Sequence, residues 1–176
     1  MESGTKPVAE RDASGVTLAI GGRDPDEGVF GEIYQDLRRF SAVVGRAGAD
    51  PDDLLQDALA RVLSKHPLSS LDDPARYLRV VVLRLAANER RRAARDERAM
   101  NRLAEAVPYE FEIPGLSDYL SLLSPRERAV LYLGIVEDRT AEEVGRMLGM
   151  RAGAVRTAKA RALKRLRAAS GRPISE

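Results

Sequence analysis

The stretch TAEEVGRMLGMRAGAVRTAKARALKRLR, residues 140–167, contains two helical patterns separated by a glycine-centred turn. Thr140 and Glu143 stand in capping-box order, which predicts the start of a helix. Gly149 occupies the position of a helix C-cap glycine, and a cationic helical pattern follows it. A short capped helix, a tight turn and a second helix together predict a helix-turn-helix.

The cationic helix of this motif has two dissimilar sides. At about 100° per residue, the apolar side collects Val155, Ala158, Ala162, Leu163 and Leu166. The candidate nucleic-acid contacts lie opposite that side or at the N-terminus, and they are Arg151, Arg156, Thr157, Arg161 and Lys164. Cations separated by small residues suit a helix that enters a major groove about 12 Å wide. A solvated surface helix would share this charge pattern, but the capped helix and the glycine turn upstream favour DNA.

The rest of the chain also follows helical periods. Pro25 opens a first helix, Asp50 and Pro51 cap and open a second, and Asp73 with Pro74 opens a long third helix. We therefore predict an all-α protein with two small helical domains joined by a flexible linker. The predicted segments are a disordered tail (1–24), a first domain (25–95), the linker (96–115), a helix-turn-helix domain (116–169) and a second tail (170–176).

The composition excludes several classes of function. The chain of 176 residues has no cysteine and one histidine, His66, which rules out disulfides, thiolate zinc sites and a histidine metal cluster. It carries no glycine loop for phosphate, no paired nucleophile and base, and no acidic cluster at metal spacing. We therefore expect no catalytic residue, no metal and no cofactor, and we expect that the protein is not an enzyme.

The apolar residues also argue against insertion into a membrane. No apolar run approaches the roughly 20 residues needed to cross a bilayer, and the start lacks a signal-peptide pattern. A basic helix on a membrane surface needs large apolar residues opposite its cations, whereas alanines and two leucines stand there in residues 151–169. We expect a soluble, cytoplasmic protein. A peripheral membrane protein remains an alternative of a different class.

Segments in both halves of the chain resemble a known protein family. DDLLQDALARVL (52–63) and ARYLRVVVLRLAANERRR (75–92) look like the N-terminal domain of bacterial RNA polymerase sigma factors, and residues 123–167 look like their C-terminal DNA-binding domain. Both parts in this order, with a short linker between them, resemble the compact extracytoplasmic-function (ECF) group of the sigma-70 family. The resemblance implies a subunit that binds core RNA polymerase, directs it to specific promoters and assists promoter opening.

The resemblance also implies roles for individual residues. Asp53, Gln56 and Asp57 match a family stretch whose polar face binds the largest polymerase subunit, and Arg61 shares that face. The third helix matches the segment that opens and reads the downstream (minus ten) element. Its candidate contacts are Arg76, Arg79, Arg84, Arg91 and Arg95. The cationic helix matches the reader of the upstream (minus thirty-five) element. The alternative is that Asp53, Gln56, Asp57 and Arg61 form only the solvated start of a helix and bind no partner.

Several positions depart from the family pattern. Tyr77 stands where the family often has Trp, and Arg84 stands where it often has Asn. Arg84 can bind phosphate or stack on a base, but it lacks the paired donor and acceptor of an amide. Ala158 and Ala160 replace larger residues in the cationic helix. These departures bear on which bases the chain prefers.

Two further expectations concern the linker and the partners. The linker carries Glu105, Glu110 and Glu112 beside Tyr109 and Phe111, which suits either mimicry of a nucleic-acid strand inside polymerase or a solvated spacer. An exposed polymerase-binding face makes an anti-sigma factor a candidate partner, beside core RNA polymerase and promoter DNA. The alternative function is a polymerase-independent helix-turn-helix regulator. Such a regulator has no need of the DDLLQD face.

Overall fold

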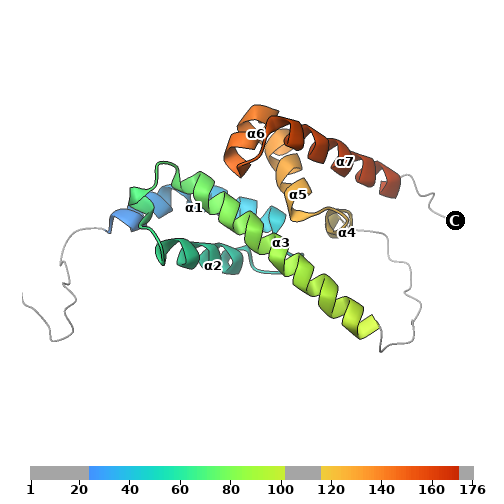
Figure 1. The fold of residues 1–176 in the computed structure, drawn as a ribbon, viewed down its shortest axis with the longest axis horizontal. Coiled ribbons are helices and arrows are strands. Elements are labelled where there is room, and N and C mark those ends of the chain that lie inside the picture. Colours follow the sequence, from blue (N-terminus) through green and yellow to red (C-terminus); the bar gives the residue numbers. More distant parts are fainter. Residues whose placement is uncertain (1–23, 102–115, 171–176) are drawn as a thin grey trace, which may run out of the picture.

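A computed structural model describes residues 24–101 and 116–170, with side chains described for 24–96 and 119–170. The ordered elements of these ranges are helices, with no strand among them, which confirms the all-α prediction. They are α1 (Pro25–Val44), α2 (Pro51–Leu63), the 3-10 turn η1 (Leu68–Ser70), α3 (Pro74–Asn101), α4 (Leu116–Ser121), α5 (Pro125–Leu131), the π-helical turn η2 (Tyr132–Val136), α6 (Ala141–Leu148) and α7 (Ala152–Ser170). Figure 1 shows α3 running beneath the group formed by α5, α6 and α7.

The first three helices pack around an aliphatic core. α1 and α2 begin as predicted, because the Asp24 and Asp50 side chains accept the N–H groups of Asp26 and Asp52. The fully buried side chains of this unit include Leu37, Phe40, Leu55, Leu78 and Val82. These residues come from all three helices and fix how the helices pack together.

Asp52 holds α1 and α2 together from outside the core. Its carboxylate accepts a hydrogen bond from Arg38 Nε at 2.9 Å and another from Tyr34 Oη at 2.8 Å. The bond from Arg38, followed by that from Tyr34, holds the pKa of Asp52 below its usual value. An ionised Asp52 therefore stabilises the contact between the two helices.

α3 extends further than predicted. It buries Leu78, Val82 and Leu85, while Val81 is half-buried. The helix continues beyond Arg95 to Asn101, into the segment predicted as linker. From Asn88 to Arg92 its side chains are exposed, so this last part extends past the core of the first unit.

The second unit contains two capping boxes, one of which is the box predicted at Thr140 and Glu143. The Ser124 and Thr140 side chains accept the N–H groups of Glu127 and Glu143, whose carboxylates bind back to the two capping residues. Gly149 ends α6 with φ +64°, the left-handed conformation expected of a glycine C-cap. A short turn then leads into α7, in the order predicted from the sequence.

Two features of this unit had no counterpart in the predictions. After α5 the helix continues as the π-helical turn η2, which is wider than an α-helix. Asp138 then adopts φ 50°, which is unusual for a residue other than glycine. Gly145 lies so close to the turn after α6 that an added Cβ would meet Met150 O at 2.7 Å. This approach fixes the angle at which α7 leaves α6.

The two units pack against each other in one continuous core, which the sequence pattern did not predict. Arg128 on α5 is only 8% exposed, and its Nη2 donates to Val44 O at 2.5 Å and to Gly45 O at 2.8 Å, at the end of α1. Its Nη1 donates to Leu120 O at 3.3 Å. Burial and the nearby Arg90 lower the pKa of Arg128, but a guanidinium keeps its charge at physiological pH.

Truncation of a core leucine should destabilise the first unit. Leu55→Ala removes a side chain that is 0% exposed, so we expect the free energy of unfolding to fall by about 2–5 kcal/mol. Urea titration followed by circular dichroism measures this change. Leu63→Ala on the same helix is the control, because Leu63 is 44% exposed and its truncation should cost about 0.5 kcal/mol or less. Equal losses for the two variants would contradict the packing described above.

Asp52 should make stability depend on pH. Because its pKa is lowered in the folded chain, its stabilisation is complete above the unfolded pKa of about 3.9 and is lost as pH falls through the folded pKa. We expect Asp52→Asn to reduce the free energy of unfolding at pH 7 and to converge with the parent chain in strong acid. Asp53→Asn removes the same charge without the two bonds, so it should change stability little at pH 7.

Candidate functional site

Three exposed surfaces carry the candidate functional residues. The α2 face consists of Asp53, Gln56, Asp57 and Arg61. The α3 face consists of Arg76, Tyr77, Arg84, Asn88 and Arg91. The α7 face consists of Arg151, Arg156, Thr157, Arg161 and Lys164. These surfaces lie on different helices, so each can meet a different partner (Figure 1).

The four residues of the α2 face are all exposed. Their helix buries Leu54, Leu55, Ala58 and Val62 on its other side, which leaves the polar side free for a partner. Asp57 and Arg61 form an ion pair at 3.1 Å, one helical turn apart. Both side chains are more than half exposed, so this pair holds their positions only weakly.

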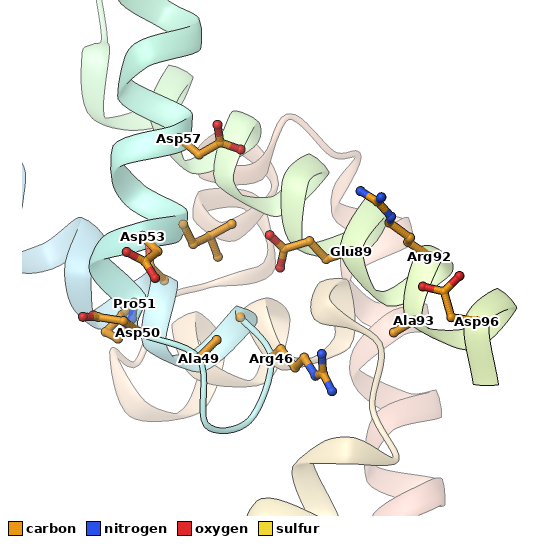
Figure 2. Close-up of a pocket in the computed structure, with 13 residues that line it drawn as sticks. Arg46, Ala49, Asp50, Pro51, Asp53, Asp57, Glu89, Arg92, Ala93 and Asp96 are labelled. Carbon is orange, nitrogen blue, oxygen red and sulfur yellow. The ribbon is translucent and has the colours of Figure 1, made fainter. Parts of the chain in front are cut away.

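A cleft of about 510 Å³ adjoins the α2 face. Figure 2 shows Asp53 and Asp57 on one wall, and Glu89 and Arg92 on α3 forming the other. The lining carboxylates are Asp50, Asp53, Asp57, Glu89 and Asp96, and the lining guanidiniums are Arg46 and Arg92. Two of the four predicted polymerase-binding residues, Asp53 and Asp57, thus line a larger, predominantly acidic cleft, whereas Gln56 and Arg61 do not line it.

The α3 residues that line this cleft, among them Glu89 and Arg92, were not predicted as candidate residues. The signal was present in the sequence, because Glu89 and Arg92 fall on the stripe that Leu78, Val82 and Leu85 occupy earlier in the helix. Charged residues that continue an apolar stripe indicate that the helix has left its core. They do not indicate which other helix they will meet.

The α3 face lines a second cleft of about 1050 Å³. One wall carries Arg76, Tyr77, Arg84, Asn88 and Arg91, and the other includes Arg126 of α5 and Met150 after α6. Four guanidiniums and the two carboxylates of Asp72 and Asp73 line this cleft, so its net charge is positive.

Two more arginines of α3, Arg79 and Arg95, were predicted to contact DNA. Arg95 lies on the same side of the helix as the α3 face, and Arg79 does not. Arg95 is exposed one turn beyond Arg91. Arg79 is half-buried and does not line the cleft, because its position in the helical repeat turns it away from Arg91.

Asn88 on this face was not among the predicted contacts. Asn88 Oδ1 accepts a hydrogen bond from Arg91 Nη2 at 2.5 Å, and Asn88 lies one turn after Arg84. It places an amide close to the position where the family often has Asn. His66 lies in the loop after α2, beside this face, with its ring edge-on to that of Tyr77 at 6.4 Å between centroids, and Tyr77 remains 39% exposed.

The α7 face is exposed, opposite the buried Val155 and Ala162. Arg156 Nη1 is paired with Glu142 Oε1 of α6 at 2.9 Å. Thr157 Oγ1 donates to Gly153 O at 3.0 Å, within its own helix. Within the described part of the chain, Arg161 and Lys164 make no hydrogen bond or ion pair and are free to meet phosphates.

Other cations of α7 stabilise the second unit. Lys159 Nζ donates to Gly134 O at 3.2 Å, and Arg165 Nη1 binds Glu127 at 2.8 Å. Burial acts to raise the pKa of Glu127, but hydrogen bonds from Ser124 and the nearby Arg165 outweigh it, so the pKa lies below its usual value. Some cations of α7, such as Lys159 and Arg165, therefore bind groups within the second unit, while those of the α7 face remain exposed.

The described residues contain no group of three or more acidic, histidine or cysteine side chains suited to a metal ion. None of the described helices combines the length and the apolar character needed to cross a bilayer. The predicted linker contacts at Glu105, Tyr109, Glu110, Phe111 and Glu112 lie outside the described residues, as do most of the two predicted tails.

The chain matches known proteins in both of its parts. The family model for Sigma-70, region 4 matches residues 119–168. The RNA polymerase sigma-E factor of Streptomyces coelicolor is 33% identical over 126 residues, covering 67% of this chain and 70% of that protein. The ECF RNA polymerase sigma factor ShbA of Streptomyces griseus is 53% identical over 49 residues, covering 28% of this chain and 26% of that protein.

A solved structure extends the similarity to the fold. The sigma factor RpoE of Bartonella quintana, in complex with the anti-sigma factor NepR, matches with a TM-score of 0.56 and 17% identity, over 84% of this chain and 98% of that chain. Together these matches favour a sigma factor over a polymerase-independent regulator. The chain belongs to the extracytoplasmic-function group of the sigma-70 family of RNA polymerase sigma factors.

Proposed function

We propose that the three surfaces divide the work of a sigma factor. The α2 face binds core RNA polymerase, the α3 face binds the opened downstream element, and the α7 face reads the upstream element in duplex DNA. The observation that carries this division is the placement of three exposed polar surfaces on three different helices, each backed by buried apolar residues.

The α2 face has the chemistry of a protein-binding surface. Its carboxylates lie beside a predominantly acidic cleft, which would repel nucleic acid and attract a basic partner. Gln56 adds an uncharged donor and acceptor between the two aspartates. We assign Asp53, Gln56, Asp57 and Arg61 to core polymerase, with Glu89 and Arg92 at the edge of the same surface.

The α3 face suits an unpaired strand. Guanidiniums in the cleft follow the phosphates, while Tyr77 offers an exposed ring on which a base stacks. Holding a strand open costs a few kcal/mol for each unstacked step, and binding of the displaced bases offsets that cost. Arg76, Arg84, Arg91 and Arg95 take the phosphate role here, and Asn88 supplies the amide that Arg84 lacks.

The α7 face suits the major groove of a duplex. Arg161 and Lys164 are exposed cations without partners among the described residues, so they are available to phosphates or bases. Arg156 pairs with Glu142 at 2.9 Å, but both side chains are more than half exposed, so the pair orients Arg156 only weakly before DNA arrives. Arg151 lies just before the first turn of the helix, where free amides attract phosphate.

The remaining expectations belong to the same proposal. The chain makes or breaks no covalent bond and acts by binding alone, in the cytoplasm. The structural relative RpoE is bound to an anti-sigma factor, which supports an anti-sigma factor as a partner of this chain. Core RNA polymerase and promoter DNA are its other partners.

Charge reversal on the α2 face should weaken the complex with core polymerase. Asp53→Arg together with Asp57→Arg turns two exposed carboxylates into cations, and we expect the Kd to rise roughly tenfold or more. Titration of fluorescently labelled chain with core polymerase measures this change.

Glu32→Arg on α1 is the matched control, because Glu32 is an exposed acid outside the α2 face. Its Kd should stay within about twofold of the parent chain. A parent chain that binds promoter duplex but not core polymerase would support the polymerase-independent regulator instead.

Truncation on the α7 face should weaken binding to the upstream element. If Arg161 contacts a phosphate, Arg161→Ala should weaken all sequences alike and reduce the salt slope by about 1. If it contacts a base, the loss should be about 1–3 kcal/mol and confined to one position of the element. Polymerase complexes on a promoter library at two salt concentrations distinguish these cases. Arg39→Ala on α1 is the control, and an equal effect there would refute the assignment.

A further inference from the structure

The loop between α2 and α3, residues 64–73, forms one end of the cleft that the α3 face lines. Its last three residues, 71–73, line the cleft, and Tyr77 lies just beyond them in the first turn of α3. His66, earlier in the same loop, holds its ring edge-on to the Tyr77 ring. The position of this loop therefore determines the shape of the cleft around Tyr77.

The loop end of the cleft differs in charge from the rest. Asp72 and Asp73 lie at this end, whereas the four guanidiniums that line the cleft come from α3 and α5. Carboxylates repel phosphates, so a strand in the cleft keeps its backbone near the guanidiniums and turns its bases toward the loop. A displaced loop would therefore alter the contacts of the bases more than those of the phosphates.

A side chain from outside the loop holds its middle. Asp26, in the first turn of α1, accepts a hydrogen bond through Oδ1 from Ser69 N at 2.8 Å, across 43 positions of sequence. Ser69 belongs to the 3-10 turn η1, whose own N-cap residue, Pro67, has no side chain that can accept such a bond. Asp26 takes the place of the missing local cap, because its carboxylate satisfies an amide at the start of the turn.

The surroundings of Asp26 favour its charged form. Hydrogen bonds from the backbone and the side chain of Ser69 hold the pKa of Asp26 below its usual value. The positive end of the α1 dipole acts in the same direction. Leu68, next to the bonded amide, is 1% exposed and belongs to the core. The core and the carboxylate therefore hold the same turn, one from inside and one from outside.

We propose that Asp26 is a positioning residue for the downstream element, because it fixes loop 64–73 in the place that the opened strand requires. This inference rests on the α3 face as the site of that strand. Figure 1 shows the starts of α1 and α3 at the same end of the first unit. Asp26 acts through the loop and the ring of Tyr77, and it lies outside the three surfaces described above.

The only histidine of the chain gives a direct measure of the loop position. The imidazole protons of His66 give one set of signals in a proton NMR spectrum, and the Tyr77 ring shifts them from the values of an unstructured peptide. Asp26→Ala should move these signals toward the unstructured values, because the loop loses its tether. Unchanged signals in that variant would overturn the tether.

Glu27→Ala is the matched control for both measurements. Glu27 is an exposed acid in the same first turn of α1, so its truncation removes an equal charge from the helix start. Among the described residues its side chain makes no hydrogen bond to the loop. Its His66 signals should therefore match those of the parent chain, and a shift equal to that of Asp26→Ala would overturn the inference.

Strand binding tests the functional part of the inference. Complexes of the full chain with core polymerase are titrated with a fluorescent single-stranded oligonucleotide that carries the downstream element. We expect Asp26→Ala to raise the Kd for the strand roughly three- to tenfold and to weaken the preference between bases. The Kd for core polymerase should stay within about twofold of the parent value. Parent-like strand binding, or an equal loss of polymerase binding, would overturn the positioning role.

Two checks keep the outcomes separate. Asp26→Asn keeps an acceptor oxygen without the charge, so its effects should be smaller than those of the alanine variant. If circular dichroism shows that Asp26→Ala is unfolded, the asparagine variant decides, and parent values in both measurements refute the inference. A parent complex that binds no strand refutes the assignment of the α3 face instead, while the NMR comparison still decides the tether.

Discussion

A helix must find partners for the backbone groups at its ends, and this requirement governs the whole molecule. At the starts of α1, α2, α5 and α6, free backbone N–H groups are capped by side chains only a few residues away. The capping residues are Asp24, Asp50, Ser124 and Thr140. The end of α6 is closed by Gly149. The end of α1 also receives Arg128, which lies on the other unit. Together with the shared core, this non-local cap joins two units that have their own helices and their own local caps.

This difference explains what the sequence could predict. A local cap leaves a pattern that spans three or four residues, so the helix starts at Pro51 and Ala141 were predicted correctly. The cap from Arg128 leaves no such pattern, because its partners are carbonyls 83 and 84 residues away and any residue supplies a carbonyl. Sequence periodicity therefore identified the parts of the fold and left their packing undetermined.

The same reasoning applies to the candidate residues. The exposure of Asp53, Asp57 and Arg161 followed from helical periodicity, because each lies opposite a buried stripe. Arg79 was assigned to the same side of its helix as the other arginines, but its position in the helical repeat turns it away from the cleft that Arg84 and Arg91 line. Asn88 was passed over because nothing in its own segment marks it, although it lies one turn from Arg84. Charge identified the type of surface, and the helical repeat determined which charges belong to it.

The hydrogen bond within α7 between Thr157 and Gly153 O bears on how a base would be read. The only hydrogen of the hydroxyl is used inside the helix, so Thr157 turns outward a methyl group and oxygen lone pairs. In the major groove such a surface packs against the methyl group of thymine, or accepts from the amino group of adenine or cytosine. It has no hydrogen to donate to the acceptors of guanine. If the α7 face enters a major groove as proposed, Thr157 would therefore contact thymine, adenine or cytosine rather than guanine.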